Sequence, residues 1–261
     1  MQIQEALAIE DKEVVTFVGG GGKTTAMFRL AGELAAAGRR VVVTTTTRIF
    51  AAQMQQAPHV ILSDDERDIL GRLPGSLRTH RIVLVVRGVV DVERDSVTKA
   101  DGVSGGLVAR MRDVSDAVLV EGDGSRRRPF KAPGEHEPVV PPCTSLLVPV
   151  VGIDVVGSPL TDEHVHRARI VANLAGVEPG TPVTEQLVAE VIGHADGGRK
   201  RLPPQARFQP LINKIETPLQ QRQAEQIATD LLRRRNVDGV CIGAVESEDP
   251  ILRRFTPTAI P

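Results

Sequence analysis

Four consecutive glycines followed by a lysine and two threonines are the strongest chemical signal in the sequence. They occupy residues 19–25, between an apolar run, Val14–Val18, and a stretch with helical spacing, Thr24–Ala37. Glycine lets successive backbone N–H groups turn toward one anion and lets phosphate oxygens approach without meeting a Cβ atom. The following helix would point the positive end of its dipole at the same anion. The spacing therefore predicts a phosphate-binding loop.

The polar residues of this loop each have a defined use in phosphate chemistry. Lys23 is expected to reach the terminal phosphates and stabilise their developing charge, so it is a candidate catalytic residue. The Thr24 hydroxyl is expected to bind Mg²⁺, and Thr25 to bond the α-phosphate. The residues expected to hold the phosphates share this loop and are Gly19, Gly20, Gly21, Gly22, Lys23, Thr24 and Thr25.

The loop departs from the common pattern G-x-x-x-x-G-K-[ST], because Phe17 stands where that pattern has its first glycine. The match is to a shorter form, in which Gly19 and Gly22 flank two residues before Lys23. The alternative is a glycine-rich turn with a surface lysine. Only 6 of the 32 basic residues are lysines, which favours a site that needs a compact ammonium. We expect Lys23 to lie at the loop mouth, where its removal changes stability little.

Two carboxylates end a second predicted strand, Ala117–Glu121. They are Glu121 and Asp123. Ligands of open α/β sheets bind at the carboxyl ends of the strands, and phosphate loops work with a carboxylate that holds Mg²⁺ directly or through water. We expect Glu121 and Asp123 to hold the metal together with Thr24, and Asp123 to be catalytic. The alternative is a strand that ends in an ordinary acidic turn.

Two further polar runs lie close to these residues in the predicted sheet. Arg126–Arg128 could neutralise phosphate charge or hold a phosphorylated substrate, although a solvated loop explains them almost as well. Thr44–Thr47, at the end of the second strand, could line the γ-phosphate or Mg²⁺. Both runs are therefore candidates for the edge of the site.

Asn213 and Lys214 follow the predicted strand Phe208–Ile212. They are similar to the N-K-x-D element with which GTP-binding proteins recognise guanine. Glu216 stands where that element has Asp, and it is longer by one methylene group. We expect Asn213 and Lys214 to contact a purine base, with a strand running into a polar turn as the alternative.

Strand and helix patterns alternate along the rest of the chain. We expect an α/β protein with a P-loop, a mostly parallel sheet flanked by helices, and one domain over residues 1–261 with a helical insertion near 155–205. A hairpin is expected at Arg87–Val97. The other expected strands are Arg40–Thr46, Val60–Leu62, Ile82–Val86, Ser145–Val151 and Gly239–Ala244. The other expected helices are Asp162–Leu174, Glu185–Ile192 and Pro218–Arg235.

Composition narrows the class of protein. The 261 residues are 41% hydrophobic and 25% charged, as in ordinary globular chains, and the net charge is −1. Without a basic excess or any Trp or Tyr, a nucleic-acid partner is not expected. No apolar run reaches about 18 residues, and two distant cysteines do not make a disulfide framework. We expect a cytoplasmic protein without a membrane partner.

Taken together, the motifs resemble those of the YqeC family. The resemblance covers nearly the whole chain, and the block D-G-S-R…K-A-P…E-H-E-P is its most specific part. The segments that carry it are Thr16–Phe50, Val120–Pro141, Gly152–Asp154, His164–Arg167 and Asn213–Lys214.

The resemblance implies a P-loop nucleotide-binding protein, and the residues described above make Mg²⁺ and ATP or GTP its expected ligands. It also implies an accessory role in the maturation of a selenium-dependent molybdenum hydroxylase or its cofactor, with that hydroxylase or a cofactor-processing protein as partner. The first forty residues are similar to the ATP site of Mur-type peptide ligases as well. Three functions stay open at this point: an NTPase, an ATP-dependent ligase or kinase, and a nucleotide-switched binding module without catalysis.

Overall fold

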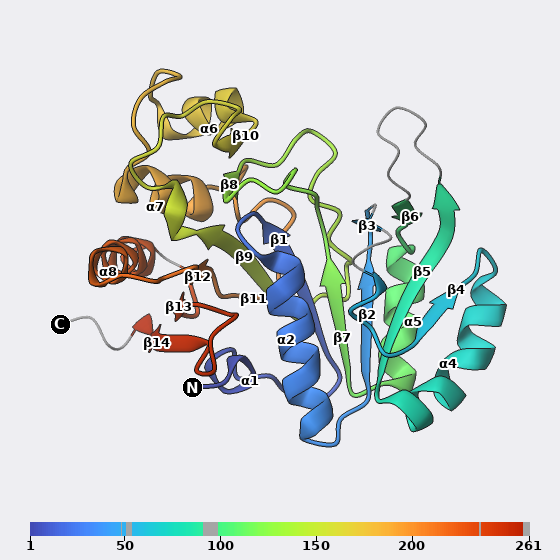
Figure 1. The fold of residues 1–261 in the computed structure, drawn as a ribbon. Helices are drawn as coiled ribbons and strands as arrows, with labels where there is room; N and C mark the ends of the chain where they lie inside the picture. Colours follow the sequence, from blue (N-terminus) through green and yellow to red (C-terminus); the bar gives the residue numbers. More distant parts are fainter. Residues whose placement is uncertain (48, 51–53, 91–98, 235, 258–261) are drawn as a thin grey trace.

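A mostly parallel β-sheet forms the centre of the computed structural model, which describes residues 1–47, 49–50, 54–90, 99–234 and 236–257. Its strands are β1 (Glu13–Gly19), β2 (Val41–Thr45), β3 (Ile49–Phe50), β4 (Val60–Leu62), β5 (Ile82–Val90), β6 (Lys99–Asp101), β7 (Ala117–Glu121), β9 (Leu146–Gly152), β11 (Arg207–Phe208), β12 (Leu211–Asn213), β13 (Val240–Gly243) and β14 (Ile251–Phe255). Their order is β14-β13-β12-β9-β1-β7-β2-β5-β6-β3, with β11 beside β9 and β4 beside β5 (Figure 1).

Parallel pairing brings the carboxyl ends of the central strands to one edge of this sheet. Strand β1 lies between β7 and β9, with Phe17 opposite Glu121 and Gly19 opposite Val150. Strand β12 pairs with the other side of β9, so that Asn213 lies opposite Gly152. Residues far apart in the sequence therefore meet where the glycine loop begins. Only β14, β6 and β3 pair antiparallel in the described part of the sheet.

Helices cover both faces of the sheet (Figure 1). They are α1 (Ile3–Ala6), α2 (Lys23–Ala36), α4 (Glu66–His80), α5 (Gly105–Val114), α6 (Ala168–Ala175), α7 (Glu185–Gly193) and α8 (Pro218–Leu232), with a 3₁₀ turn, η1 (Ile153–Val155). One face packs against α1 and α2, and the other against α4 and α5 at one end and α7 and α8 at the other. This α/β fold, with a glycine loop between β1 and α2, confirms the expected P-loop NTPase-like class.

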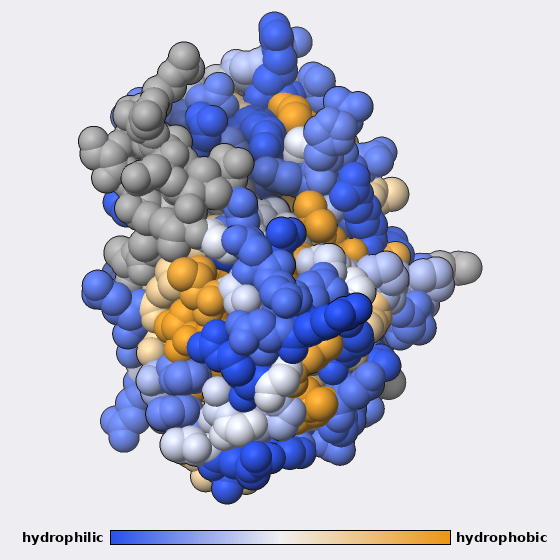
Figure 2. Space-filling view, turned by 90° about the vertical axis from the view of Figure 1, so that its right-hand side faces the viewer, coloured by the Kyte–Doolittle hydropathy of each residue, from blue (hydrophilic) through white to orange (hydrophobic). Residues whose placement is uncertain are grey.

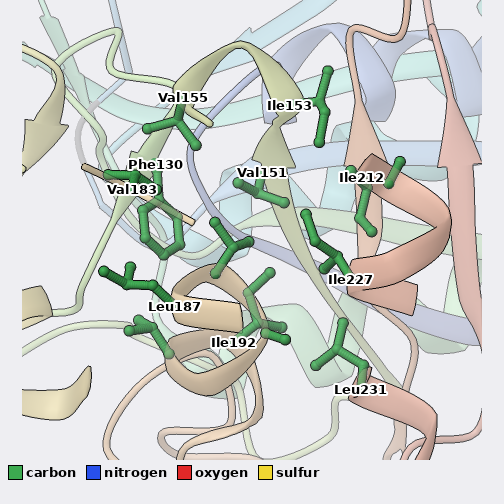
Figure 3. Close-up of a cluster of buried hydrophobic side chains, with 14 of the residues drawn as sticks. Phe130, Val151, Ile153, Val155, Val183, Leu187, Ile192, Ile212, Ile227 and Leu231 are labelled. Atoms are coloured by element: carbon green, nitrogen blue, oxygen red, sulfur yellow. The ribbon is translucent and has the colours of Figure 1, made fainter. Parts of the chain in front are cut away.

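Alternation along the strands decides which residues enter which half of the core. In β1, Val15 and Phe17 pack in the layer with α2, whereas Val14 packs in the layer with α4 and α5. Buried on both faces, the central strands read as continuous apolar runs, which is why their positions are predicted well. A third group of buried side chains lies where α7 and α8 cover the sheet. Figure 3 shows this group, in which Val151 of β9 lies near Leu187 of α7 and Ile227 of α8.

The segment between β9 and β11 contains α6 and α7 and begins differently from the prediction. A helix was expected from Asp162, but α6 begins at Ala168. The intervening Val165–His166 forms strand β10, which pairs parallel with β8 (Phe130–Lys131). The Asp162 carboxylate accepts a hydrogen bond from the Ala168 N–H at 3.0 Å. This small sheet joins the segment to the loop that follows β7.

Two helices that cover one face of the sheet, α4 and α5, were not predicted. Helix α4 contains Gly71, Pro74 and Gly75, which normally interrupt helices. It forms because Asp65 caps its first turn and because three residues spaced by four, at 69, 73 and 77, are buried under β4 and β5. Helix α5 begins with two glycines and depends in the same way on a cap and on burial. Tertiary packing outweighs local propensity in both.

Three other predicted elements differ in extent by more than one residue at an end. The expected strand 208–212 is divided into β11 and β12 at Gln209 and Pro210, since proline has no N–H for the ladder. Strand β5 continues to Val90 and pairs antiparallel with β6, while residues 91–97 of the expected hairpin lie outside the described residues. Helix α8 ends at Leu232, three residues early.

The molecular surface beside α4 and β5 is largely hydrophilic, with hydrophobic residues in separate patches (Figure 2). Within the described ranges, no helix has the length and apolar character needed to cross a bilayer.

Leu77→Ala tests whether α4 is held by its buried face. Leu77 is fully buried, so the substitution is expected to lower the free energy of unfolding by about 2–5 kcal/mol. Leu219→Ala in α8 is the matched control, because Leu219 is 57% exposed and should change stability by no more than about 0.5 kcal/mol. Chemical denaturation monitored by circular dichroism measures both. Equal losses would contradict the packing of α4.

Candidate functional site

The glycine loop has a backbone shape that other residues would resist. Gly19, Gly21 and Gly22 have φ values of +93°, +73° and +114°. A Cβ atom on Gly21 would lie 2.0 Å from the Gly152 nitrogen, so this position excludes side chains by contact as well as by conformation. The loop therefore packs directly on the end of β9.

The amino end of α2 has no side-chain cap, and the residue before it is Gly22. Helices α4, α5, α7 and α8 are each preceded by a side chain that accepts a backbone N–H, whereas α1 and α6 lack such a cap, like α2. The first N–H groups of a helix have no partner inside the helix. Together with the helix dipole, these groups make the start of α2 suited to an anion.

Lys23 is buried, with 4% of its surface exposed. Its ammonium donates to the Gly19 carbonyl at 2.8 Å and lies 3.4 Å from Asp123 and 3.7 Å from Glu121. This differs from the expected position at a loop mouth, because the carboxylates hold the ammonium inside. The predicted lysine and both predicted carboxylates therefore gather at one place.

Thr24 and Glu121 form a pair of oxygen donors beside this lysine. The Thr24 hydroxyl donates to Glu121 Oε2 at 2.8 Å, and the Glu121 side chain is 12% exposed. No group of three His, Cys, Asp or Glu side chains in the described residues could hold a metal by itself. Mg²⁺ commonly takes one or two protein oxygens and completes its shell with phosphates and water, so this donor pair fits it.

Asp123 is more enclosed than Glu121, with 2% exposure, and its contacts face the loop backbone. Its two oxygens accept from the Gly19 N–H at 3.0 and 3.1 Å. Lys131 lies 3.0 Å from Oδ2, on the side away from Lys23. The Asp123 carboxylate thus lies between two cations, Lys23 and Lys131, and holds the start of the glycine loop through Gly19.

The threonines at the end of β2 use their hydroxyls within the protein. Thr44 donates to the Val85 carbonyl at 2.7 Å, Thr45 to the Glu121 carbonyl at 3.0 Å, and Thr46 to the Val139 carbonyl at 2.6 Å. These bonds hold the ends of β2, β5 and β7 together and so position Glu121.

Asn213 reaches the glycine loop from the end of β12. Its amide nitrogen donates to the Gly21 carbonyl at 2.8 Å, and its oxygen accepts from the Val245 N–H at 2.9 Å. The side chain is 2% exposed, so it joins the phosphate loop to the loop after β13. A side-chain amide has two donor and two acceptor sites, so these two bonds use one donor and one acceptor site of Asn213.

A pocket of about 310 Å³ opens beside Asn213 and the start of α2. Lys214 lies on its wall and pairs with Asp154 at 2.8 Å. The full lining is Gly22, Thr25, Asp154, Asn213, Lys214, Glu216, Gln220, Ala244, Val245 and Glu246. The predicted base-contacting residues therefore lie in one pocket with the end of the phosphate loop.

The arginine run packs its backbone against the same loop. The Arg128 carbonyl accepts from the Gly21 N–H at 3.2 Å. Arg126 and Arg127 are exposed and have φ values of +50° and +61°. This left-handed conformation is costly for residues with side chains and is commonly found at functional sites.

Three charged residues of the site were not predicted: Lys131, Glu137 and Arg167. Arg167 pairs with Glu137 through two hydrogen bonds, at 2.6 and 2.9 Å, and Lys131 donates to Glu137 at 2.5 Å. Burial acts to raise the pKa of Glu137, but hydrogen bonds from Arg167 and Lys131 outweigh it and lower the pKa to about 2. All three lie in the segments Val120–Pro141 and His164–Arg167, which carry the family resemblance. That resemblance was the sequence signal by which they could have been found.

Comparison with known proteins agrees with that resemblance. The chain is 30% identical over 144 residues to a protein of Escherichia coli (strain K12) that carries the name "Uncharacterized protein YqeC", and the match covers 55% of this chain and 56% of that protein.

Among solved structures, the chain is similar to the signal recognition particle receptor FtsY from Elizabethkingia anophelis, with a TM-score of 0.39 and 14% identity. That match covers 98% of this chain and 68% of the other. The model of the family described as "YqeC protein" matches residues 15–169. This match extends over more than half of the chain and includes the glycine loop and the segment from Glu121 to Arg167, so the protein belongs to the YqeC family.

Proposed function

We propose that the protein binds a purine nucleoside triphosphate with Mg²⁺ and hydrolyses it as an NTPase. The observation that carries this proposal is the uncapped start of α2, where Lys23 and the Thr24–Glu121 pair meet beside a pocket of about 310 Å³. Phosphate would occupy the start of the helix, and the nucleoside would occupy the pocket.

Lys23 supplies positive charge to the terminal phosphates in this arrangement. Its partners without nucleotide are a carbonyl and two carboxylates, all within 4 Å. A triphosphate brings more negative charge to the same place and competes for the ammonium. In a buried site this attraction is strong and stabilises charge that develops during phosphoryl transfer.

Thr24 and Glu121 are the residues that we assign to Mg²⁺. Bound there, the ion would neutralise charge on the phosphates. Asp123 was expected to share this role and to be catalytic. Because its oxygens are bonded to the Gly19 N–H and to Lys131, we assign it instead to the shape of the loop.

The base can be adenine or guanine. Asn213 and Lys214 at the pocket wall favour guanine. The longer Glu216, which stands where the guanine-binding element has Asp, and the likeness of the first forty residues to Mur-type ligases favour adenine.

A second candidate function, transfer of phosphate to an acceptor by a ligase or kinase, is favoured by one observation. Arg126 and Arg127 have positive φ values, and the carbonyl of the next residue, Arg128, accepts a hydrogen bond from the Gly21 N–H of the phosphate loop. Exposed arginines at that position can orient an anionic acceptor. Product analysis distinguishes the two, since an NTPase releases only free phosphate.

For the cellular role, we propose maturation of a selenium-dependent molybdenum hydroxylase or its cofactor, in the cytoplasm, with the hydroxylase or a cofactor-processing protein as partner. Family membership supports this role. Direct binding of such a hydroxylase by the protein, measured with and without Mg-nucleotide, tests it.

Lys23→Ala tests the phosphate site. Loss of hydrogen bonds to a charged group is expected to weaken Mg-nucleotide binding by at least about tenfold. Titration calorimetry measures the affinity, and Lys12→Ala is the control, because Lys12 is an exposed lysine that bonds carbonyls of residues 112–115. If Lys23→Ala binds like the wild type, the phosphate site is wrong.

Glu121→Gln tests the metal assignment, because it keeps the size of the side chain and removes its charge. We expect binding in the presence of Mg²⁺ to weaken at least about tenfold, and binding in EDTA to stay the same or become tighter. Asp116→Asn is the control, since Asp116 pairs with Arg40, opposite the start of β2. An equal loss with and without Mg²⁺ would remove Glu121 from the metal site.

Thermal shifts decide the choice of base. Ligand at about 100 times its Kd stabilises a fold by about 2.7 kcal/mol, so the preferred Mg-nucleotide should raise the Tm by roughly 5–10 °C. If GTP gives a larger shift than ATP and Asn213→Ala removes the difference between the two nucleotides, with each shift measured from the variant's own Tm, the pocket recognises guanine. A larger shift with ATP that Asn213→Ala leaves unchanged would exclude guanine recognition. A dye or calorimetry is the suitable readout, because the chain has no Trp or Tyr.

A further inference from the structure

Five charged side chains of alternating sign connect the phosphate loop to the start of α6. The series is Lys23, Asp123, Lys131, Glu137 and Arg167, and successive charged atoms are 3.4, 3.0, 2.5 and 2.6 Å apart. It begins at the lysine of the proposed phosphate site and ends at the residue that precedes α6. Its middle members are the most buried, since the side chains of Asp123 and Lys131 are 2% and 1% exposed.

The Lys131 ammonium is enclosed by three oxygen partners inside the protein, two through hydrogen bonds and one through an ion pair. Its partners are Asp123 at 3.0 Å, Glu137 at 2.5 Å and the Gly124 carbonyl at 2.6 Å. Its side chain is only 1% exposed and its charge is matched by two carboxylates. We therefore expect it to influence a ligand through the groups that it contacts.

Asp123 connects Lys131 to the phosphate loop. Both of its oxygens accept from the N–H of Gly19, where β1 ends and the chain turns with φ +93° into the phosphate loop. A Cβ atom on Gly19 would lie 2.4 Å from the Val150 carbonyl oxygen, so the backbone at this turn has little room. The position of the Asp123 carboxylate thus decides where the loop begins.

We propose that Lys131 is a positioning residue for the phosphate loop. When Lys23 turns toward a phosphate, Asp123 loses one of its two cations. A buried carboxylate without a cation is strongly destabilised, so the turn would be opposed if Lys23 were its sole partner. Lys131 keeps Asp123 paired, and Asp123 keeps Gly19 in place, while Lys23 is released to the ligand. Glu137 and Arg167 hold Lys131 from the other side.

This inference rests on the proposed function, and its test separates an effect on the ligand from an effect on folding. Lys131→Met removes the ammonium and keeps an unbranched chain of similar length. We expect it to weaken Mg-nucleotide binding, measured by calorimetry with Mg-ATP and Mg-GTP, by at least about tenfold. Stability is measured on the same samples by chemical denaturation.

Arg207→Met is the matched control. Arg207 pairs at 2.8 Å with Glu13, a carboxylate that is 4% exposed at the opposite end of β1. The Arg207→Met substitution leaves the Glu13 carboxylate buried without its arginine. Glu13 lies on β1, like Gly19, but at the end away from the phosphate loop. We expect a loss of stability comparable to that of Lys131→Met, with nucleotide affinity unchanged within about twofold.

A double-mutant cycle tests the route through Asp123. If Lys131 acts on the ligand through this carboxylate, Asp123→Asn combined with Lys131→Met should bind no more weakly than the weaker of the two single variants. Additive losses would overturn the inference, and so would wild-type affinity in Lys131→Met. If Lys131→Met does not fold, Arg167→Met replaces it. We expect that variant to bind Mg-nucleotide about threefold more weakly than the wild type. Unchanged affinity in Arg167→Met would also overturn the inference.

The same experiment distinguishes failure of the proposed function from failure of this inference. A wild-type protein that binds neither Mg-ATP nor Mg-GTP contradicts the proposed function. A wild-type protein that binds, loses binding in Lys23→Ala and keeps it in Lys131→Met contradicts the positioning role alone.

Discussion

The hydrogen bonds from the Gly19 N–H to the Asp123 carboxylate are the interaction on which the rest of the site depends. They join the end of β1 to the residue two positions beyond β7, across the parallel pair that forms the centre of the sheet. The glycine loop begins at this bond, and α2 begins at the end of the loop. Lys23, the first residue of the helix, returns to the same place by donating a hydrogen bond to the Gly19 carbonyl at 2.8 Å.

The Asp123 carboxylate that accepts this bond is buried, so it needs cations beside it. This need explains why several ionic residues gather at the site. An isolated carboxylate at 2% exposure would be costly, and the two lysines beside Asp123 offset that cost. Lys131 in turn is balanced by Glu137, whose low pKa keeps it ionised at neutral pH. The small sheet between β8 and β10 brings these groups together, so the segment with α6 and α7 is part of the site's support.

Much of the fold is readable in the sequence where one physical signal dominates. The buried parallel strands are apolar runs, and β4 and β7 begin and end where they were predicted. Helix α4 was missed, because Pro74 and two glycines contradict a helix locally while burial against β4 and β5 maintains it. The start of α6 was placed six residues too early, because the pairing of Val165–His166 with β8 is a contact between distant segments.

The amino-acid sequence by itself determined the phosphate loop, the strand and helix around it, and the carboxylates at the end of β7. These features are local, since glycine conformation, helix polarity and apolar runs act within a few residues. Only the tertiary structure decided that Asp123 faces the loop backbone while Glu121 faces Thr24. It also decided that Lys131 stands behind Asp123. The physical reason is that parallel pairing aligns strand ends from distant segments, and burial then requires every charge in that space to find a partner.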